Sequence, residues 1–499
     1  MRLSHLLTGI EYLDIVGPTD IEITGLTTDS RSIKQGDLFV CLKGNHYNGH
    51  DFIPQAIING ASAIICEHTS FNFNFPENIA CIKVASTEKV LAPLGAFFYD
   101  FPARKLQIYG VVGTNGKTTS TYLLKSILER AGYKVGLIGT IKYIIGNEEI
   151  PAKNTTPNAL ELQQLMSRMV SQGITHLVME VSSHAIKLGR IEQCQFAGGI
   201  FTNITQDHLD FHKTFEEYLA VKASFFAALP RNSWAAINLD DPHAEDFMAK
   251  TSANIVTYSK EKHADICAVN ARVKPDGISY FLSTREGNGT KINLHLTGEF
   301  NISNSLGVAA LAYHAEKIPL TVIKKGLQDI YGVNGRVERV RVDTDFSILV
   351  DYAHTPDALE NVLRTLRGFT PRRLIVLFGC GGDRDKTKRP LMGKIAARYA
   401  DFVIVTSDNP RSENPESIIK DIVAGINEEQ FTNYQTITDR YEAIFAAVSM
   451  AKKGDVIVIA GKGHETYQIF ADKTIYFDDR EVAIEAVKEL KKNDKMVGA

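Results

Sequence analysis

The sequence predicts an α/β protein built from consecutive domains, and three observations support this. The chain has 499 residues, which suffice for about three domains or for two large ones. Apolar strand-like runs alternate with helical stretches over most of the chain, which is typical of parallel sheets covered by helices. Two breaks in composition, at residues 100–105 and 331–336, separate the alternating regions. We therefore expect domains at residues 1–104, 105–335 and 336–499.

The middle region shows the clearest alternation. Its expected strands and helices cover residues 106–112, 117–131, 134–138, 158–171, 174–181, 199–203 and 234–239. The order strand, helix, strand, helix, strand predicts a parallel sheet with helices on its faces. An Asn288-Gly289 turn predicts a hairpin within the same domain.

The last region repeats this alternation, and the first region is less regular. Short apolar strands are expected at residues 348–352, 374–378, 402–406 and 456–460, with helical stretches between them. This pattern favours a Rossmann-like α/β domain, whose ligand groups would lie at the carboxyl ends of the strands. Strand-like runs at residues 24–29, 38–42 and 63–66, with a helical run at 53–59, predict a small N-terminal α/β domain.

The composition is that of an ordinary globular protein. Hydrophobic residues make up 44% of the chain and charged residues 23%, and the net charge is −3. Such a balance gives no reason to expect nucleic acid or an anionic membrane as a partner. No apolar stretch is long enough to span a membrane, and no secretion signal is visible at the N-terminus. The six cysteines are scattered without a paired motif, so we expect reduced thiols in a cytoplasmic protein and no zinc site.

The sharpest local signal is a glycine-rich loop between an expected strand and an expected helix. It reads Gly113, Thr114, Asn115, Gly116, Lys117, Thr118, Thr119. Glycines let backbone N–H groups approach phosphate oxygens, and the helix N-terminus adds partial positive charge. Lys117 can reach the outer phosphates of a nucleotide, and the Thr118 hydroxyl can bind Mg²⁺. The loop is a variant, because the generic spacing requires glycine where this chain has Val111. Nucleotide binding is predicted, with a glycine turn that caps an unrelated helix as the alternative.

Further motifs follow in an order that one family shares. They are Asp29-Ser30-Arg31, Thr155-Thr156-Pro157, Glu180-Val181-Ser182-Ser183-His184, Thr202-Asn203-Ile204 running to Asp207-His208, Gly298-Glu299-Phe300-Asn301 with Asn304, Gly335-Arg336, Asp351-Tyr352-Ala353-His354, Asp408-Asn409-Pro410-Arg411 and Gly461-Lys462-Gly463-His464-Glu465. With these motifs the chain resembles the Mur ligases, ATP-dependent amide-forming enzymes of peptidoglycan synthesis, over nearly its whole length. Among them it is most similar to the members that add the third residue of the stem peptide.

The resemblance implies a domain plan, a reaction and a set of partners. The three domains would bind the UDP-linked substrate, ATP and an amino acid, in that order along the chain. ATP, with Mg²⁺, would phosphorylate the terminal carboxylate of UDP-N-acetylmuramoyl-L-alanyl-D-glutamate. The amine of meso-2,6-diaminopimelate would then attack the acyl phosphate and expel phosphate. The resemblance also implies a cytoplasmic enzyme, and we expect a monomer.

The resemblance places four catalytic residues in the middle region. Lys117 would neutralise charge where a carboxylate meets ATP. Glu180, at the end of an apolar strand, and His208 would bind Mg²⁺ together with Thr118. Without the phosphate loop, Glu180 would be interpreted as an exposed carboxylate at a strand end, and a lone histidine such as His208 is more often structural. Lys222 reads as an ordinary helix lysine, but the resemblance implies a lysine carbamylated by CO₂ (N6-carboxylysine), whose negative charge would also bind Mg²⁺. This requires an amine that burial keeps partly neutral.

Two further groups of residues match substrate-binding positions of the family. For ATP, Asn301 and Asn304 match the adenine side, Arg336 the γ-phosphate and Asp351 the ribose, with surface salt bridges as the alternative for the last two. For the UDP-linked substrate, the matching residues are Ser30, Asn45, His46, Tyr47, Asn154, Thr155, Thr156, Ser182 and Arg190. Arg190 could pair with a carboxylate or phosphate of that substrate.

The last region would select the amino acid. The residues that match the diaminopimelate site are Arg384, Asp408, Asn409, Pro410, Arg411, Gly461 and Glu465. Lysine and meso-diaminopimelate differ by one distal carboxylate, so a site that selects the latter needs a fixed cation. Arg411 offers a planar donor with two prongs, on a loop that Pro410 stiffens, and Arg384 would be a second clamp. Asp408 and Glu465 could take ammonium groups.

Other functions compete with the diaminopimelate-adding ligase. The L-lysine-adding ligase of the same family is the first alternative, and Arg411 disfavours it. Ligases that add D-Ala-D-Ala, or glutamate to folate, are disfavoured by the Asn-Pro-Arg loop. A nucleotide-binding regulatory or scaffold protein without catalysis would not need Lys117, Glu180, His208 and Lys222 together.

Overall fold

The N-terminal region of the computed structural model forms a sheet of its own, with strand order β1-β5-β4-β3-β2. The structure describes residues 1–44, 47–67, 75–274 and 277–497. The elements of this region are α1 (Leu3–Leu6), β1 (Asp14–Val16), β2 (Leu26–Thr27), β3 (Leu38–Val40), α2 (Ile53–Ile58), β4 (Ala63–Glu67), β5 (Ala80–Val84) and α3 (Thr87–Phe98). All neighbouring strands are parallel except β1, which is antiparallel to β5. The small α/β domain is thus confirmed, although the strand expected at 24–29 shortens to β2.

The chain divides into two compact units that do not follow the sequence in simple blocks. The first holds residues 1–110, 132–199 and 228–233, and the second holds residues 111–131, 200–227 and 234–499. Strands β6 (Gln107–Val112) and β11 (Phe196–Phe201) contribute residues to both units.

The remainder of the first unit is a sheet segment with the order β11-β6-β10-β7-β8-β9. Its further elements are β7 (Val135–Ile138), β8 (Lys142–Ile145), β9 (Glu148–Pro151), α5 (Ala159–Ser171), β10 (His176–Glu180) and α6 (Ser183–Lys187). Strands β10 and β7 are parallel, whereas β8 and β9 continue the sheet as antiparallel strands. Helix α5 packs against α3, and its residues Ala159 and Leu160 join the apolar core of the N-terminal region.

The second unit begins with a sheet segment of order β16-β15-β14-β13-β12-β11-β6. Its elements are α4 (Lys117–Arg130), α7 (Leu209–His212), α8 (Phe215–Ala227), β12 (Trp234–Asn238), α9 (Ala244–Met248), β13 (Asn254–Ser259), β14 (Ile266–Lys274), β15 (Gly277–Thr284), β16 (Gly289–Leu294), α10 (Phe300–Ala315) and α11 (Leu320–Gln328). The expected hairpin is present, because β15 and β16 pair across the Asn288 turn. The sheet is mixed rather than purely parallel, since β14, β15 and β16 form an antiparallel meander with an exposed face.

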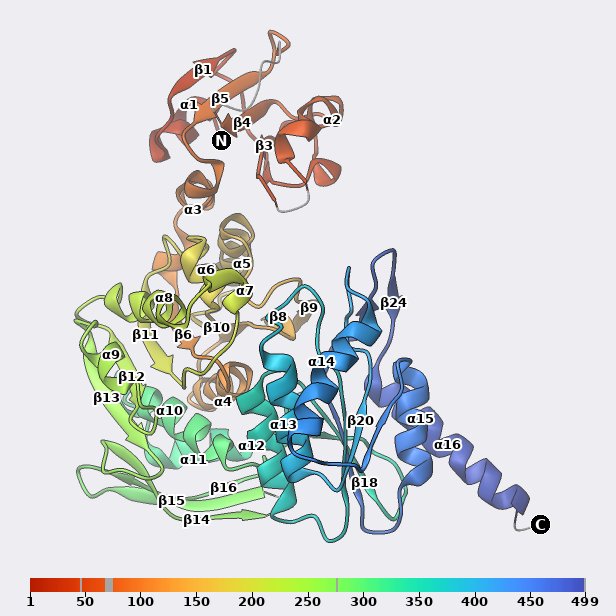
Figure 1. Cartoon of the computed structure of the whole chain (residues 1–499). Helices are drawn as coiled ribbons and strands as arrows, with labels where there is room; N and C mark the ends of the chain where they lie inside the picture. Colours follow the sequence, from red (N-terminus) through yellow and green to blue (C-terminus); the bar gives the residue numbers. More distant parts are fainter. Residues whose placement is uncertain (45–46, 68–74, 275–276, 498–499) are drawn as a thin grey trace. The chain divides into compact units, whose positions relative to one another are not determined.

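A separate sheet of order β17-β18-β22-β19-β20-β21 forms the C-terminal part of the second unit. Its elements are β17 (Glu338–Arg339), β18 (Ser347–Asp351), α12 (Pro356–Arg367), β19 (Leu374–Phe378), α13 (Lys388–Tyr399), β20 (Phe402–Val405), α14 (Pro415–Glu428), β21 (Tyr434–Thr436), α15 (Arg440–Met450), β22 (Val456–Ala460), β23 (Tyr467–Ile469), β24 (Thr474–Tyr476) and α16 (Asp479–Val497). The strands of this six-stranded sheet are parallel apart from β17, and β23 and β24 form a separate antiparallel pair. Helices α12, α13 and α14 cover one face, and α15 and α16 the other (Figure 1).

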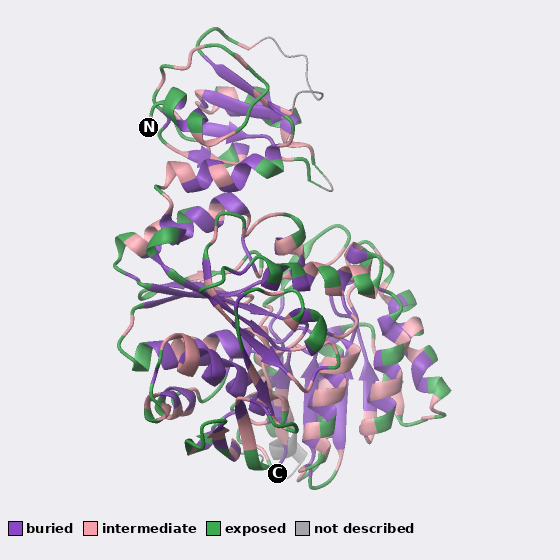
Figure 2. Ribbon diagram, turned by 90° about the vertical axis from the view of Figure 1, so that its left-hand side faces the viewer, coloured by how far each residue is buried: buried purple, intermediate pink, exposed green. Residues whose placement is uncertain are grey.

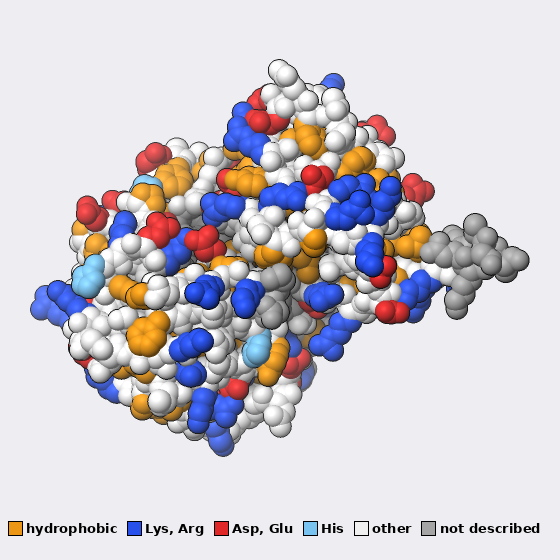
Figure 3. Space-filling model, turned by 90° about the horizontal axis from the view of Figure 1, so that it is seen from below, with side chains coloured by type: hydrophobic (Ala, Val, Ile, Leu, Met, Phe, Trp, Pro, Cys, Tyr) orange, Lys and Arg blue, Asp and Glu red, His pale blue; other side chains and the backbone are white. Residues whose placement is uncertain are grey.

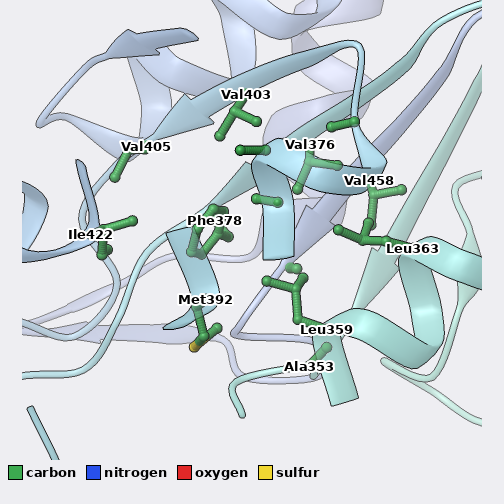
Figure 4. Packing of buried hydrophobic residues seen from close by; sticks show 14 of the residues in the cluster. Ala353, Leu359, Leu363, Val376, Phe378, Met392, Val403, Val405, Ile422 and Val458 are labelled. Carbon is green, nitrogen blue, oxygen red and sulfur yellow. The ribbon is translucent and has the colours of Figure 1, made fainter. Parts of the chain in front are cut away.

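This C-terminal sheet is apolar on both faces, which explains the continuous hydrophobic runs in the sequence. In β19, Val376 and Phe378 point into the core beneath α12, α13 and α14 (Figure 4). Ile375 and Leu377, which alternate with them, point into the opposite core beneath α15 and α16. The central strands β19 and β22 are accordingly buried, whereas the helices have exposed outer faces (Figure 2). The Rossmann-like α/β arrangement expected for this region is confirmed.

The surface matches the balanced composition. On the face shown in Figure 3, acidic and basic side chains are interspersed with uncharged ones, in keeping with 55 basic and 58 acidic residues in the chain. Among the helices of the described residues, none combines the length and the apolar character that a membrane span requires. The six cysteines are free thiols, as expected.

Candidate active site

The glycine-rich loop lies between β6 and α4, where the sequence predicts it. The Lys117 ammonium folds back over the loop and donates to the carbonyl oxygens of Gly113 and Thr114, at 2.9 and 2.8 Å. Gly116 has a φ of 85°, and a Cβ atom there would lie 2.2 Å from Asn304 Oδ1. The backbone path of the loop therefore requires glycine at position 116.

The segment after β11 anchors this loop. The Asn203 carbonyl accepts from the Thr114 N–H at 2.8 Å, and its side-chain oxygen accepts from the Asn115 N–H at 2.9 Å. The Thr202 hydroxyl donates to the Asn115 carbonyl at 2.7 Å. We assigned no role to Thr202 or Asn203 from the sequence, although both lie in one of the motifs. Their contribution depends on a contact between distant segments, which no local pattern reveals.

Lys222 lies in α8 with its side chain buried. Its ammonium nitrogen donates to the Gly113 carbonyl at 2.8 Å, the same oxygen that Lys117 contacts. Burial, reinforced by the charge of Lys117 and opposed by Asp207, holds the pKa of Lys222 well below its ordinary value of 10.5. A lowered pKa favours the neutral amine, which is the form of a lysine side chain that acts as a nucleophile. Burial thus favours the neutral form of Lys222 more than an exposed helix position would.

Asp207 and His208 lie in the second unit, near the phosphate loop. His208 directly precedes α7 with a left-handed φ of 56°, and its Nε2 is 3.3 Å from Asp207 Oδ2. Burial alone would raise the pKa of Asp207, but the charges of His208 and Lys388 outweigh it and leave that pKa below its ordinary value. Asp207 is therefore an anion that attracts the positive groups of His208 and Lys388 beside the loop.

The residues present suit a nucleotide-bound Mg²⁺ better than a metal held by protein alone. Over the described ranges, no three His, Cys, Asp or Glu side chains are grouped closely enough to hold a metal ion. Mg²⁺ usually binds only one or two carboxylates and completes its octahedron with waters and substrate phosphates. Thr118, buried in the first turn of α4 beside Thr119, has the hydroxyl oxygen that such a site uses.

Glu180 lies in the first unit, at the end of β10, and is buried. Its carboxylate accepts from the Thr140 N–H at 2.8 Å and from the Thr140 hydroxyl at 2.9 Å. The Thr140 and Thr155 hydroxyls are 3.1 Å apart, so Thr155 belongs to the same polar cluster. The sequence did not single out Thr140, which orients the carboxylate.

The residues expected to hold the peptide part of the UDP-linked substrate lie together in the first unit. The Thr156 hydroxyl donates to the Glu180 carbonyl at 2.8 Å and lies 3.3 Å from the Ser182 hydroxyl. Arg190 donates to the Thr156 carbonyl at 3.0 Å, and the Asn154 carbonyl accepts from a tyrosine hydroxyl at 2.8 Å. Burial lowers the pKa of Arg190. Bonds to backbone carbonyls thus hold the side chains of Thr156 and Arg190 in place, and Asn154 is bonded to the neighbouring tyrosine.

The residues expected at the uracil side lie in the N-terminal region. Ser30 is buried, and its carbonyl accepts from the Asn59 side chain at 2.7 Å. Tyr47 is 75% exposed, so its ring is available to a ligand. Asn45 and His46 lie outside the described residues.

Two asparagines of α10 lie beside the phosphate loop. The Asn304 amide donates to Asn301 Oδ1 at 2.9 Å, and the Asn301 amide donates to the Thr297 carbonyl at 2.7 Å. Both side chains are buried at the start of the helix, as the sequence predicts. The close approach of Asn304 to Gly116 links this pair to the loop.

Residues that follow the middle region also reach the phosphate loop. Arg336 donates to the Thr118 hydroxyl at 2.9 Å, and its guanidinium lies 4.7 Å from the centre of the Tyr352 ring. Asp351, at the end of β18, is buried and accepts from two backbone N–H groups, at 2.6 and 2.7 Å. Burial raises the pKa of the Asp351 carboxyl, although Arg336 opposes this. Asp357, which sequence reasoning missed, accepts from the Asn115 amide at 2.6 Å.

Two arginines meet where β19 and β20 end. Arg411 donates to the Gly382 carbonyl at 2.8 Å, and Arg384 donates to the Asp383 carbonyl at 2.9 Å. Burial lowers the pKa of Arg411, and the charge of Arg384 lowers it further. Two guanidinium groups that repel each other form a favourable site for an anion.

Acidic groups lie beside these arginines. The Asn409 amide donates to Glu465 Oε2 at 2.9 Å, and Lys462, which we did not predict, donates to Glu465 at 3.2 Å. Burial raises the pKa of Glu465, and the negative charge of Asp408 raises it further. Gly461 has a φ of 109°, and a Cβ atom there would lie 2.7 Å from Asp408 Oδ2. Cationic and anionic groups together suit a ligand that carries both charges.

A buried ion pair holds the strand ends from which these loops begin. Arg440, at the start of α15, donates twice to the carboxylate of Asp479, at 2.7 Å each, and both side chains are fully buried. The same guanidinium donates to the carbonyls of Ser407 and Ala460, at 3.2 and 3.1 Å. Each carbonyl directly precedes a residue of the expected amino-acid site.

Comparison with known families gives three matches along the chain. Residues 22–99 match the family described as Mur ligase family, catalytic domain. Residues 111–312 match the Mur ligase middle domain, and residues 335–463 match the Mur ligase, glutamate ligase domain.

Individual relatives align over nearly the whole chain. Two of them are named UDP-N-acetylmuramoyl-L-alanyl-D-glutamate--2,6-diaminopimelate ligase. The protein from Clostridium tetani is 48% identical and the protein from Bacillus licheniformis 45% identical, and each alignment covers 98% of this chain and 100% of the relative. A solved structure with that same ligase name is 32% identical, with a TM-score of 0.64 over 98% of this chain and 99% of the other. A MurF ligase from Thermotoga maritima in complex with ADP, 20% identical, shares the fold with a TM-score of 0.66 over 95% of this chain and 98% of the other.

Proposed function

The chain belongs to the Mur ligase family, and from this premise we propose that it is an ATP-dependent ligase that joins meso-2,6-diaminopimelate to UDP-N-acetylmuramoyl-L-alanyl-D-glutamate. It acts in the synthesis of peptidoglycan precursors, in the cytoplasm and as a monomer. The observation that carries the amino-acid assignment is the pair Arg384 and Arg411 beside Asp408 and Glu465. The names of full-length relatives at 43–48% identity support the same substrates.

The reaction joins a carboxylate to an amine in two steps. The terminal carboxylate of the UDP-linked dipeptide attacks the γ-phosphate of ATP, which gives an acyl phosphate and ADP. The diaminopimelate amine then attacks the acyl carbon, and the tetrahedral intermediate expels phosphate as the amide forms. The first step brings two anions together, so the site must neutralise charge and hold the reacting groups in line.

The phosphate loop binds ATP in this proposal. Its residues 113–119 surround the phosphates with backbone N–H groups, and Lys117 turns from its carbonyl partners to the outer phosphates. Asn301 and Asn304 contact the adenine, Asp351 the ribose and Arg336 the γ-phosphate. Arg336 already lies 2.9 Å from the loop hydroxyl of Thr118, which supports this assignment.

The proposal includes a modified lysine and a bound Mg²⁺. Lys222 is carbamylated by CO₂, which turns a buried ammonium into an anion beside the loop. The lowered pKa of Lys222 supports this, because the neutral amine is the form that reacts. The carbamate, Thr118, Glu180 and His208 would hold Mg²⁺, which would neutralise charge on the phosphates.

The domains divide the substrates among them. Residues 1–104 bind the uridine end through Ser30 and Tyr47, with Asn45 and His46, and residues 105–335 bind ATP. The peptide end of the same substrate contacts the residues Asn154, Thr155, Thr156, Ser182 and Arg190. Residues 336–499 bind the amino acid. Their arginines bind its distal carboxylate, and their acidic residues bind its ammonium groups.

Phosphate release tests the proposal directly. The purified chain is given ATP, Mg²⁺ and UDP-N-acetylmuramoyl-L-alanyl-D-glutamate, with diaminopimelate and lysine in parallel reactions. We expect phosphate to appear only when all substrates are present, and diaminopimelate to be strongly preferred. A preference for lysine would show that the chain is the lysine-adding ligase, and release that does not require an amino acid would contradict a ligase.

A further inference from the structure

The two loops that carry Arg384 and Arg411 are joined by a network that the proposed roles do not include. We call residues 381–386 and 408–413 the two arginine loops. The Gly382 N–H donates to the Asn409 carbonyl at 2.9 Å, and the Asp383 N–H donates to Glu413 Oε1 at 2.6 Å. In the other direction, Ser412 donates to the Asp383 carboxylate through its N–H at 3.1 Å and its hydroxyl at 2.7 Å.

A buried arginine holds the Glu413 end of this network. Arg389, near the start of α13, is only 1% exposed. Its guanidinium donates to both oxygens of Glu413, at 2.8 and 3.1 Å, and to Asp421 at 2.9 Å. Paired guanidinium and carboxylate groups in this parallel arrangement define an orientation as well as a distance. The bonds from Arg389 hold the pKa of Glu413 at about 2, so that this carboxylate is charged at every physiological pH.

The backbone of both loops depends on these contacts. Asp383 and Arg411 have left-handed φ values of 54° and 52°, which are costly for residues other than glycine. A Cβ atom on Gly382 would lie 1.9 Å from the Pro410 carbonyl oxygen, so the loops touch backbone to backbone. Such a conformation persists only where the surrounding bonds determine it. Glu413 is the residue that bonds to both a loop backbone and the buried arginine.

We infer that Glu413, held by Arg389, is a specificity-determining positioning residue that sets the spacing of the Arg384 and Arg411 guanidinium groups. The inference rests on the proposed function, because it assumes that the two arginines bind the distal carboxylate of the amino acid. Glu413 itself does not touch the substrate and acts through the loops. A displacement of about 1 Å in a binding group can cost about a hundredfold in rate, so loose loops would weaken selection strongly.

The test is a double-mutant cycle with Glu413→Gln and Arg411→Ala. Glutamine keeps the size of the side chain and one oxygen acceptor. It loses the negative charge and the second oxygen to which Arg389 donates. Arg389 keeps Asp421 as a partner, so no buried cation is left alone. Glu416→Gln is the matched control, since Glu416 is an exposed glutamate three positions further along.

For Glu413→Gln we expect the KM for diaminopimelate to rise about tenfold or more, with the KM values for ATP and for the UDP-linked dipeptide nearly unchanged. The preference for diaminopimelate over lysine should fall in proportion. In the Arg411→Ala background the same substitution should have a much smaller effect, because one of the groups that it positions is absent. The control should behave as the wild type.

Three results would overturn the inference. The KM values for diaminopimelate, ATP and the UDP-linked dipeptide could all change equally, or none of them could change. Either result would show that Glu413 only supports the fold. An undiminished effect of Glu413→Gln in the Arg411→Ala background would show that it does not act through that arginine. A wild type that prefers lysine would refute the proposed substrate, yet the cycle would still report whether Glu413 acts on the amino acid.

Discussion

Lys222 and Lys117 direct two ammonium groups at one carbonyl oxygen, that of Gly113. Two cations this close are unfavourable unless one is neutral or is converted to an anion. Carbamylation of Lys222 would resolve the conflict, since it replaces the repulsion with attraction. The chemistry of this residue therefore follows from burial, which its place in an ordinary helical pattern does not reveal.

We predict that Lys222→Ala lowers kcat by a factor of roughly 100 or more, because a preorganised charge at the reacting phosphates is lost. Bicarbonate should not restore the variant, whereas a short-chain carboxylic acid should restore part of the activity by standing in for the carbamate. Steady-state phosphate release measures both effects. Lys250→Ala, at an exposed lysine, is the control, and wild-type activity in Lys222→Ala would refute the assignment.

Among the secondary-structure elements, the strands of the C-terminal sheet were the most predictable. Strands β19 and β22 have the expected bounds, because a strand buried on both faces is an uninterrupted apolar run between turn residues. The meander of β14, β15 and β16 was harder to identify. β15 and β16 alternate between buried and less buried positions, whereas β14 is exposed along most of its length even though apolar residues recur in it.

The ends of β20 and β22 depend on the buried pair between Arg440 and Asp479. We predict that Arg440→Met lowers the free energy of unfolding by about 3–5 kcal/mol, because it leaves the Asp479 carboxylate buried without a partner. Thermal and denaturant unfolding measure the loss. Arg440→Met combined with Asp479→Leu removes both charges and should recover much of the stability. If the single and double variants lose the same amount, the pair does not have this role.

The joined arginine loops should also respond to acid. Contacts with Arg389 lower the pKa of Glu413 from its ordinary 4.5 to about 2 in the folded chain. A carboxyl group whose pKa is depressed by folding stabilises the fold above its unfolded pKa, and this contribution is lost as the pH falls through the folded value. We predict that the wild type exceeds Glu413→Gln in melting temperature at pH 6, and that the difference shrinks between pH 4.5 and 2. A difference independent of pH would contradict this.

Across the whole molecule, contiguous motifs were predictable and contacts between distant segments were not. The phosphate loop was recognisable because Lys117 and Thr118 follow the glycines directly. By contrast, contacts with segments distant in the chain give Thr140, Asn203 and Glu413 their roles. No spacing in the sequence therefore marks these residues. Charge state is equally hidden, since the lowered pKa of a buried lysine depends on neighbours that only the fold supplies.

The two compact units contain different functional residues. We therefore expect that a variant can lose ATP-dependent ligation and still bind the UDP-linked dipeptide. Lys117 lies in the second unit and Ser30 in the first. We predict that Lys117→Ala abolishes ATP-dependent ligation while the Kd for the UDP-linked dipeptide changes by less than about threefold, because the uridine contacts are elsewhere. Isothermal titration of the folded variant measures this. Parallel loss of both functions would argue against separate sites.

In the proposed function, Arg411 recognises the distal carboxylate of diaminopimelate. A hydrogen bond to a charged group contributes about 1.5–3 kcal/mol, so the two-pronged arginine can supply a preference of roughly tenfold to several hundredfold. The most direct measurement is kcat/KM for diaminopimelate and for lysine, in the wild type and in Arg411→Ala. We predict that the ratio between the two falls by at least about tenfold in the variant, through a higher KM for diaminopimelate, and that Arg384 maintains a residual preference. An unchanged ratio, with both amino acids affected alike, would contradict the account.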